Sequence, residues 1–461
     1  MHRVKCRTLA VAVIVSLCTS CGSRTPPWLP PTQALTPAET TASSPGKYIK
    51  HIIVIVQENR SFENIFAGWP GADAPTYGYL HTGKRVTLQA MTYADDCARI
   101  HGYQYCDMGH LWQEALTGWN NGKMNGFDLN RYGAFGTGPL VHRHPYSYLD
   151  HAEIAPYRAM ASQYVLVDHM FPTEFGTSFT AHQDLIAGTT RVDARHSLVN
   201  VPLPSPPWGC DAYQGTTTSL VDRERKITGN GPFPCLDIYP TLADTLDAAG
   251  ISWKYYAPPQ GNAAGGVWSA FSAIKDVYDG PDWKRNVISP ETKVFDDIKA
   301  GTLPSVAWVI PDFKWSDHPA TPSNWGPSWV ADVVDEVGKS AAWRSTAIVV
   351  LWDDWGGWYD SAPPPQLDYI GLGLRVPCII ISPYARKGHI SHTRYEFGSI
   401  LKFIEQTFKL QSLGSTDVRA NSLVDAFDFT QKPRAFVPFA TNHPPSFFRK
   451  QHPSHQPPDS D

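Results

Sequence analysis

The sequence lacks a basic tract, and its charge balance is slightly negative. Its 39 lysines and arginines stand against 43 aspartates and glutamates, which gives a formal net charge of −4. Proteins that hold nucleic acid through its phosphates need clustered positive charge, and RNA-binding modules often interleave aromatic residues with basic ones. The sequence contains neither pattern. We therefore expect no nucleic-acid partner.

A long apolar run is missing from the amino-terminal region. The apolar stretch Leu9–Leu17 is too short to span a bilayer as a permanent helix. It follows three basic residues, as in an export signal, and we assign residues 1–20 to such a signal. The stretch ends in LCTSCG, which resembles the bacterial lipobox, although Cys18 stands where lipoboxes usually carry leucine. We expect Cys21 to carry a lipid anchor that holds the chain at a membrane surface, with simple cleavage and secretion or periplasmic release as the alternative.

Cysteine is scarce, with 8 residues among 461. Export would place these cysteines in an oxidising compartment, where disulfides persist. Two pairs each flank one loop, so we predict the disulfides Cys97–Cys106 and Cys210–Cys235, although four cysteines allow three arrangements. Cys378 lies inside the apolar run Val376–Ile381, and we expect it to be a buried free thiol.

The chain shows no internal repeat, and its composition divides it into four parts. After the export signal, residues 21–47 are rich in proline, serine and threonine and predict a flexible tether. Residues 48–429 contain the periodic apolar segments of a folded domain. Residues 430–461, dense in proline, histidine and serine, predict a tail that is largely unstructured or loosely wrapped.

Short apolar runs predict buried strands. They are Ile52–Val56, Tyr164–Val167, Ser252–Tyr256, Ser305–Ile310, Ala347–Trp352 and Val376–Ile381. Helical patterns lie between some of them, at Tyr239–Ala249 with Thr241 as its N-cap, and at Ser399–Phe408. Strands that alternate with helices predict an α/β fold, with a mainly parallel central sheet sandwiched between helices.

No glycine separates the first of these strands from the polar residues that follow it. The polar groups after three of the strands are Glu58 and Asn59, then Asp353 and Asp354, then the segment PDFKWSDHP with His318. Parallel strands deliver their carboxyl ends to one edge of a sheet, where α/β proteins bind ligands. Carboxylates, an amide oxygen and a histidine suit a divalent cation, and adjacent acids repel unless positive charge lies between them. Each piece alone also fits a turn, a helix cap or a surface histidine.

A nucleophile for such an edge is offered by FPTEFGTSFTAHQDLIAG, from Phe171 to Gly188. Ser178 lies two residues after Gly176, and a small residue lets the backbone approach a substrate. A bound cation could lower the pKa of a serine hydroxyl without a neighbouring triad. Thr177 and Thr180 are rivals on composition, and the segment also fits a helix that starts with a Ser/Thr cap.

The block HIIVIVQENRSFENIF resembles the opening motif of the bacterial phosphoesterase family of phospholipases C and related acid phosphatases, in the alkaline-phosphatase-like superfamily. The resemblance continues from about residue 48 to 410, in the family's order, through HLWQEALTGWNNGKMNGF, FGTSFTAHQDLIAG, DFKWSDHP, LWDDWGGWYDSAPPP, GLGLRVPCIIISPYAR and SHTRYEFGSILKFIE. It implies an alkaline-phosphatase-like fold and an exported, metal-dependent phosphoesterase that works through a seryl-phosphate intermediate.

The resemblance also implies roles for individual residues. The metal ligands would be Glu58, Asn59, Ser178, Asp353 and Asp354, and the catalytic residues Ser178, His318 and His110. Ser178 would be the nucleophile, and the two histidines would contact phosphate or protonate the leaving oxygen. The cofactor would be a divalent metal ion of unspecified identity and number.

The sequence departs from the family's pattern at other positions. Residues 179–182 read Phe-Thr-Ala-His where phospholipase-like members continue with Pro-Asn-Arg, and Leu116 replaces a frequent second histidine. Ser361 and Ala362 stand where a further histidine is common after the acidic pair. We therefore expect the chemistry to carry over and leave two substrates open, a phospholipid and a small phosphate ester. The alternative function is an exported surface-binding lipoprotein on a decayed phosphoesterase scaffold.

Overall fold

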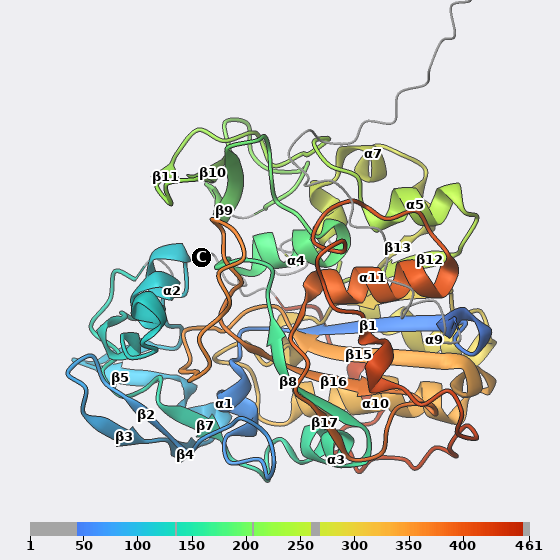
Figure 1. Cartoon of the computed structure of the whole chain (residues 1–461), viewed down its shortest axis with the longest axis horizontal. Coiled ribbons are helices and arrows are strands. Elements are labelled where there is room, and N and C mark those ends of the chain that lie inside the picture. Colours follow the sequence, from blue (N-terminus) through green and yellow to red (C-terminus); the bar gives the residue numbers. More distant parts are fainter. Residues whose placement is uncertain (1–43, 134–135, 205–206, 260–267, 455–461) are drawn as a thin grey trace, which may run out of the picture. The chain divides into compact units, whose positions relative to one another are not determined.

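The computed structural model describes residues 44–133, 136–204, 207–259 and 268–454 (Figure 1). All of them belong to one unit, Thr36–Asp461. The predicted export signal, Cys21 and the tether up to residue 43 lie outside the described residues, as do residues 455–461 of the predicted tail. None of the described helices combines the length and apolar character that a membrane crossing requires.

A nine-stranded sheet lies at the centre of the described residues. In spatial order its strands are β13 (Val287–Ile288), β12 (Trp253–Tyr256), β14 (Val306–Val309), β1 (His51–Gln57), β15 (Thr346–Trp352), β16 (Val376–Ile381), β8 (Val165–Phe171) and β17 (His389–Ser391), with β18 (Tyr395–Glu396) also paired to β8. All six predicted strands are present. The α/β fold with a mainly parallel sheet is therefore confirmed.

One strand runs against the others. β16 pairs antiparallel with both β15 and β8, whereas every other pairing in the sheet is parallel. Two reversals in succession leave β8 parallel to β15. The carboxyl ends of β1, β14, β15 and β8 consequently share one edge, which is the condition for their following loops to form one site.

Helices cover both faces of this sheet. The α-helices of the described residues are α1 (Phe62–Phe66), α2 (Trp112–Trp119), α3 (Ala155–Gln163), α4 (Ser178–Ala187), α5 (Leu242–Ala248), α7 (Lys275–Tyr278), α8 (Asp282–Arg285), α9 (Val294–Ala300), α10 (Trp325–Lys339), α11 (Phe397–Phe408) and α12 (Pro445–Phe448). In Figure 1, α4 and α11 lie above the sheet and α3 and α10 lie below it. The two predicted helices correspond to α5, where Thr241 and Asp244 form a capping box, and α11, which buries Ile400, Phe403 and Ile404.

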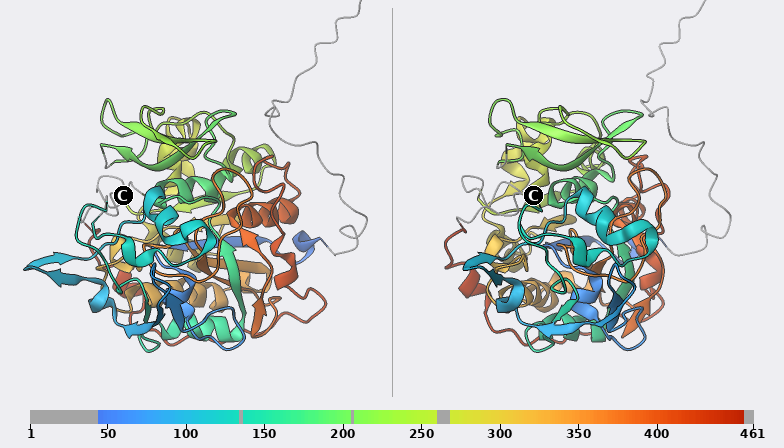
Figure 2. Two further views of the ribbon diagram at one scale, coloured as in Figure 1. Left: turned by 60° about the vertical axis from the view of Figure 1, so that its left-hand side comes forward. Right: turned by 90° about the vertical axis from the view of Figure 1, so that its left-hand side faces the viewer.

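Smaller sheets surround the central one. They are β9 (His196–Leu203) with β10 (Thr217–Asp222) and β11 (Ile227–Thr228), β2 (Tyr77–Tyr79) with β3 (Arg85–Thr87), β4 (Gln89–Met91) with β7 (Ser147–Leu149), and β5 (Ala98–Ile100) with β6 (Tyr103–Tyr105). β9 contacts α4, and in both views of Figure 2 the β9–β11 sheet lies above that helix, away from the central sheet. α4 is therefore enclosed between two sheets.

The described part of the tail, residues 430–454, wraps the domain. Phe448 is buried and its ring packs against Trp315 and Trp329. The backbone N–H of Ser454 donates to Asp312 Oδ2 at 2.8 Å. Apolar burial and backbone hydrogen bonds thus hold this segment against the loop that follows β14.

The cysteine predictions are confirmed within the described residues. Disulfides join Cys97 to Cys106 and Cys210 to Cys235. Cys378 is a buried free cysteine, and burial raises the pKa of its thiol well above the ordinary value. Its side chain therefore packs as a small apolar group in the sheet.

Candidate active site

The chain turns after β1 without a glycine because Asn59 itself adopts the left-handed conformation, with φ of 60°. Asparagine tolerates this region better than most residues. Asp353 Oδ1 accepts the backbone N–H of Asn59 at 3.0 Å and so stabilises the turn. Ser61 then caps α1 by accepting the N–H of Asn64 at 3.2 Å. The polar residues after β1 therefore lie at the edge of the sheet, between a strand and a short helix.

The acidic pair reaches the same place from the neighbouring strand. β15 pairs in parallel with β1 to its end, and the N–H of Asp353 donates to Gln57 O at 2.9 Å. Asp354 Oδ1 accepts the N–H of Gly356 at 2.8 Å. Gly356 has a φ of 58° and lies against the carbonyl of Asn59, so a side chain does not fit there. Strand register alone thus brings the Glu-Asn and Asp-Asp pairs together.

Ser178 begins α4, after the loop that follows β8. Three oxygens of the neighbouring segments surround its hydroxyl. Ser178 Oγ lies 3.3 Å from Glu58 Oε2, 3.5 Å from Asn59 Oδ1 and 3.4 Å from Asp354 Oδ2. The loop after β8 and the ends of β1 and β15 therefore converge on one serine, as the sequence predicted.

The spacing of these oxygens fits a shared cation. Hydrogen bonds between oxygens are usually about 2.5–3.0 Å long, shorter than the separations around Ser178. Oxygens that bind one divalent cation at about 2.0–2.2 Å lie about 2.9–3.5 Å apart in octahedral or tetrahedral arrangements. The four side chains are fully buried, with 0% exposure. The spacing of their oxygens is therefore compatible with one shared ion.

Charge supports the same fit. Glu58, Asp353 and Asp354 are all fully buried, and Asp353 Oδ2 has no hydrogen-bond partner among the described residues. Buried carboxylates repel one another and lose hydration unless positive charge compensates them. The nearby Arg60 is paired with Asp96 at 2.7 Å. The donor set of three carboxylates, one amide oxygen and one hydroxyl therefore suits a divalent cation.

His182 is the residue that sequence analysis did not assign to this site. It lies one helical turn after Ser178, and its Nε2 is 3.0 Å from Glu58 Oε1 and 3.9 Å from Asp353 Oδ2. Burial lowers the pKa of His182 to about 4, so the ring is neutral at pH 7 and donates to Glu58 from Nε2. The i, i+4 spacing from Ser178 was the signal available in the sequence. We call Glu58, Asn59, Ser178, His182, Asp353 and Asp354 the serine cluster.

His110 lies against this cluster. Its Nδ1 donates to Met108 O at 2.7 Å, so Nε2 of the neutral ring accepts from Asn59 Nδ2 at 3.1 Å. The same Nε2 is 3.9 Å from Asp354 Oδ2. The hydrogen bond from the amide nitrogen sets the orientation of the Asn59 side chain and directs its oxygen to Ser178.

His318 lies in the loop after β14, which adjoins the end of β1. Ser316 O in this loop accepts the backbone N–H of Glu58 at 2.8 Å. The His318 ring is buried, donates from Nδ1 to Pro319 O at 3.0 Å and packs on Phe313 with ring centroids 5.1 Å apart. The structure therefore positions His318 two residues from a backbone contact with Glu58.

Gly176 has a different structural reason from the one expected. A side chain at Gly176 would collide with Thr180 Oγ1 and with Glu174, so packing within the protein requires the glycine. The Thr180 hydroxyl donates to Thr177 O at 3.2 Å, which directs it back into its own helix. Close packing of the loop on α4 is therefore one reason for the small residue, and the approach of a substrate stays a prediction.

Comparison with known proteins gives a family model, the Phosphoesterase family, that matches residues 49–411. Non-hemolytic phospholipase C of Pseudomonas aeruginosa is 24% identical over 434 residues, which cover 83% of this chain and 58% of that protein. Phospholipase C B of Mycobacterium tuberculosis is 26% identical over 446 residues, covering 85% of this chain and 80% of that protein. Non-specific phospholipase C1 of Arabidopsis thaliana is 24% identical over 438 residues, covering 85% of this chain and 73% of that protein.

The chain spans 58% and 63% of the lengths of two bacterial non-hemolytic phospholipases C, those of Pseudomonas aeruginosa and Burkholderia pseudomallei. A crystal structure of a protein in the alkaline phosphatase superfamily from Vibrio parahaemolyticus overlaps 81% of this chain and 70% of that chain, with 9% identity and a TM-score of 0.36. At that similarity we transfer no residue role. The family model covers most of the sequence, and this chain belongs to the Phosphoesterase family.

Proposed function

We propose that this chain is a metal-dependent phosphoesterase that hydrolyses phosphate esters through a seryl-phosphate intermediate. The observation that carries the proposal is the convergence of Glu58 Oε2, Asn59 Oδ1 and Asp354 Oδ2 within 3.5 Å of Ser178 Oγ. Membership of the Phosphoesterase family supports the reaction class.

In the proposed reaction, Ser178 Oγ forms a bond to phosphorus while the bond between phosphorus and the ester oxygen breaks. The Ser178 hydroxyl loses its proton in this step and the ester oxygen takes up one proton as it leaves, so the protons balance. Water then cleaves the phosphoseryl ester, which releases phosphate from a monoester substrate or the phosphorylated head group from a phospholipid and restores the Ser178 hydroxyl. A divalent cation bound by the serine cluster would lower the pKa of the Ser178 hydroxyl and offset negative charge on the phosphoryl oxygens. Asn59 and the carboxylates would hold the cation, and His182 would orient Glu58 through their hydrogen bond.

We assign His110 and His318 to the phosphate and the leaving oxygen. Because His110 donates to Met108 O from Nδ1, its Nε2 becomes a donor only when the ring is protonated. A protonated ring would be a donor for phosphate from Nε2, the nitrogen that accepts from Asn59 in this structure.

The substrate is a phosphate ester, either a phospholipid, as the names of the relatives suggest, or a small phosphomonoester. We also propose that the chain is exported, with a cell-envelope lipoprotein anchored through Cys21 as one form and a secreted or periplasmic protein as the other. The disulfides Cys97–Cys106 and Cys210–Cys235 support an oxidising compartment.

The test is a substrate panel with purified full-length protein: phosphatidylcholine, an aryl phosphocholine and an aryl phosphomonoester, each with and without chelator. Release of diacylglycerol identifies a phospholipase C, and turnover of the monoester alone identifies a phosphatase. In both cases chelator should abolish activity. Folded protein that retains a metal but turns over none of the three would contradict the proposal and favour the alternative, a surface-binding lipoprotein.

A further inference from the structure

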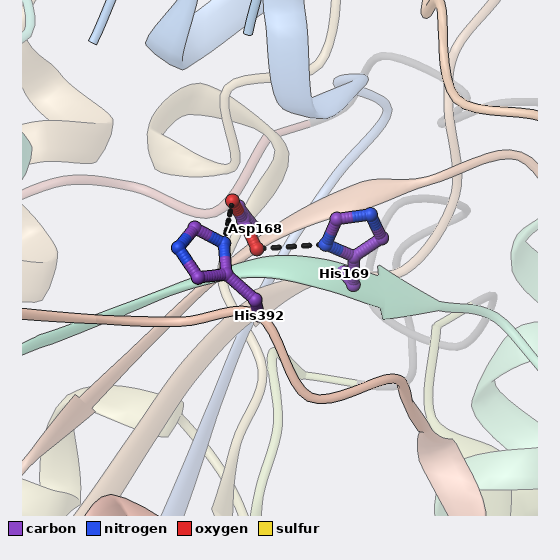
Figure 3. A group of neighbouring side chains, drawn as sticks. All are labelled: Asp168, His169 and His392. Atoms are coloured by element: carbon purple, nitrogen blue, oxygen red, sulfur yellow. Dashed lines mark hydrogen bonds and ion pairs between the residues drawn. The ribbon is translucent and has the colours of Figure 1, made fainter. Parts of the chain in front are cut away.

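A second group of side chains that could hold a metal ion lies on β8 and beside it, where β8 meets its edge strands. Asp168 and His169 are on β8, and His392 directly follows β17. β17 pairs in parallel with β8 through Ser391 and Val167, so the chain delivers His392 beside Asp168. We call Asp168, His169 and His392 the edge cluster. Figure 3 shows the carboxylate of Asp168 between the two imidazole rings.

Consecutive strand residues normally point to opposite faces, so a local irregularity is needed to bring Asp168 and His169 together. The pairing of β8 with antiparallel β16 supplies it. Val167 pairs with Cys378 and Met170 pairs with Val376, which leaves one extra residue on β8 between these pairs. The edge strands are interrupted at the same level, because β17 ends at Ser391 and β18 resumes at Tyr395. Such bulges commonly re-aim side chains.

The ligand atoms lie close to one another. His169 Nδ1 is 2.7 Å from Asp168 Oδ1, and His392 Nδ1 is 2.8 Å from Asp168 Oδ2. The three ligand atoms all lie within 4.8 Å of one another. Ligands of tetrahedral zinc, with bonds of about 2.0–2.1 Å, lie about 3.3–3.5 Å apart, so small side-chain rotations complete the geometry.

The surroundings fix the carboxylate and leave one side open. Asp168 is fully buried, and its Oδ2 also accepts the N–H of Asp73 at 2.9 Å. The side chains of His169 and His392 are 27% and 61% exposed, so an ion can enter from solvent. The Asp73 carboxylate lies 3.6 Å from Nε2 of His169, the ring nitrogen that faces away from Asp168.

The contact between the Asp73 carboxylate and Nε2 of His169 influences which tautomer His169 adopts. A histidine that binds a metal through one nitrogen usually directs its other N–H to a carboxylate. With Nε2–H directed to Asp73, the Nδ1 lone pair of His169 faces the space beside Asp168. Without an ion, the same rings can donate from Nδ1 to Asp168 as a plain hydrogen-bonded triad. The two states differ in whether a cation replaces the Nδ1 protons.

We propose that the edge cluster is a second divalent-cation site, separate from the serine cluster and of the zinc type. Two imidazole nitrogens and one carboxylate oxygen select borderline transition cations over magnesium and calcium. The open side of the site leaves a fourth position for water. Bound zinc would join the edge strands to β8 just before its end, where the loop toward Ser178 begins.

The test is zinc stoichiometry in chelator-stripped protein, measured by equilibrium dialysis and elemental analysis. The starting protein carries Asp353→Asn and Asp354→Asn, so the serine cluster does not contribute. His392→Ala is added to remove one ligand, and His389→Ala is the matched control because His389 is an exposed histidine on the adjoining strand. We expect about one zinc in the starting protein and in the His389 control, and none with His392→Ala.

Cobalt(II) gives a second readout that activity does not influence. Four-coordinate cobalt with nitrogen ligands has visible absorption, which should appear in the starting protein and vanish with His392→Ala, while a tenfold excess of magnesium should not displace it. Equal zinc content with and without His392, or no zinc in the starting protein, would overturn the proposal. Neither result would contradict the proposed reaction at Ser178, because the substrate panel tests that reaction separately.

Discussion

The serine cluster and the edge cluster are both candidate cation sites at the sheet, but they differ in charge and in solvent access. The serine cluster holds three fully buried carboxylates at the ends of parallel strands. The edge cluster holds one buried carboxylate, and hydrogen bonds from His169, Asp73 and His392 satisfy it. Burial alone would raise the pKa of Asp168, yet the His169 and Asp73 hydrogen bonds bring it below its ordinary value.

The difference teaches what each cluster requires. We expect the serine cluster to need a cation, because several buried carboxylates without positive charge between them destabilise the folded state. Hydrogen bonds already satisfy the Asp168 carboxylate of the edge cluster, so a cation there adds stability only through its own binding equilibrium. Changes to the first should therefore alter both chemistry and metal content, whereas changes to the second should alter zinc binding alone.

The largest expected effect comes from removing the acidic pair. Asp353→Asn together with Asp354→Asn should abolish metal retention by the serine cluster and all measurable turnover. In chelator the double variant should be as stable as the parent protein or more stable, because repulsion between carboxylates is relieved. Elemental analysis, turnover and urea unfolding check the three parts. Unchanged metal content at the serine cluster would show that these acids are not ligands.

The next effect separates chemistry from cation binding. Ser178→Ala should lower turnover by about 10³-fold or more, with metal content and substrate affinity nearly unchanged, because a transition-state interaction is lost. Thr177→Ala and Thr180→Ala are the matched controls and should keep most activity. Mass spectrometry of acid-quenched enzyme should find phosphate on Ser178. Phosphate on either threonine would transfer the role to that residue.

A third effect concerns His144, which belongs to neither cluster and links stability to pH. Burial lowers the pKa of His144 to about 4, below its ordinary value of 6.5. The folded state therefore binds fewer protons than the unfolded state between these two pH values. The contribution of the neutral His144 ring to the free energy of unfolding is complete above about pH 6.5 and is lost as the pH falls toward 4. The loss is at most about 3 kcal/mol. Urea unfolding at pH 7 and pH 5 should show a smaller difference for His144→Gln than for the parent. An equal difference would contradict the lowered pKa of His144.

A smaller effect concerns the hydrogen bond from His182 that orients the Glu58 carboxylate. His182→Ala should weaken cation binding by the serine cluster about tenfold, because a carboxylate ligand loses the hydrogen bond that orients it. Turnover at saturating metal should recover in large part. Competition with a coloured chelator measures the affinity, and Thr180→Ala on the same helix serves as the control. Unchanged affinity would mean that the contact between His182 and Glu58 is only packing.

The smallest effect is expected at the edge cluster without metal. In chelator, His392→Ala should change the free energy of unfolding by less than about 1 kcal/mol, because the ring is largely exposed and its ion pair is screened by solvent. Urea unfolding with zinc should then separate the parent from the variant. A loss well above this value in chelator would indicate that the hydrogen-bonded triad itself supports the sheet edge.

Much of the serine cluster was predictable from local sequence. Short apolar runs indicated buried parallel strands, and polar residues directly after them indicated the edge where strand ends meet. Glu58, Asn59, Asp353 and Asp354 follow from that rule, and the family motifs added Ser178. The rule works because a buried parallel sheet imposes one direction and one burial pattern on each strand.

Sequence alone thus determined six strands of the central sheet and the convergence of their polar ends, and it favoured the two disulfide pairs, since each depends on residues that are close in the chain or on strand direction. Tertiary structure decided the rest. The contact of His182 with Glu58, the packing reason for Gly176 and the bulge that turns Asp168 and His169 together all depend on how segments far apart in the chain meet. A shift of one residue in strand register reverses which side chains face a site, and only the packed sheet sets that register.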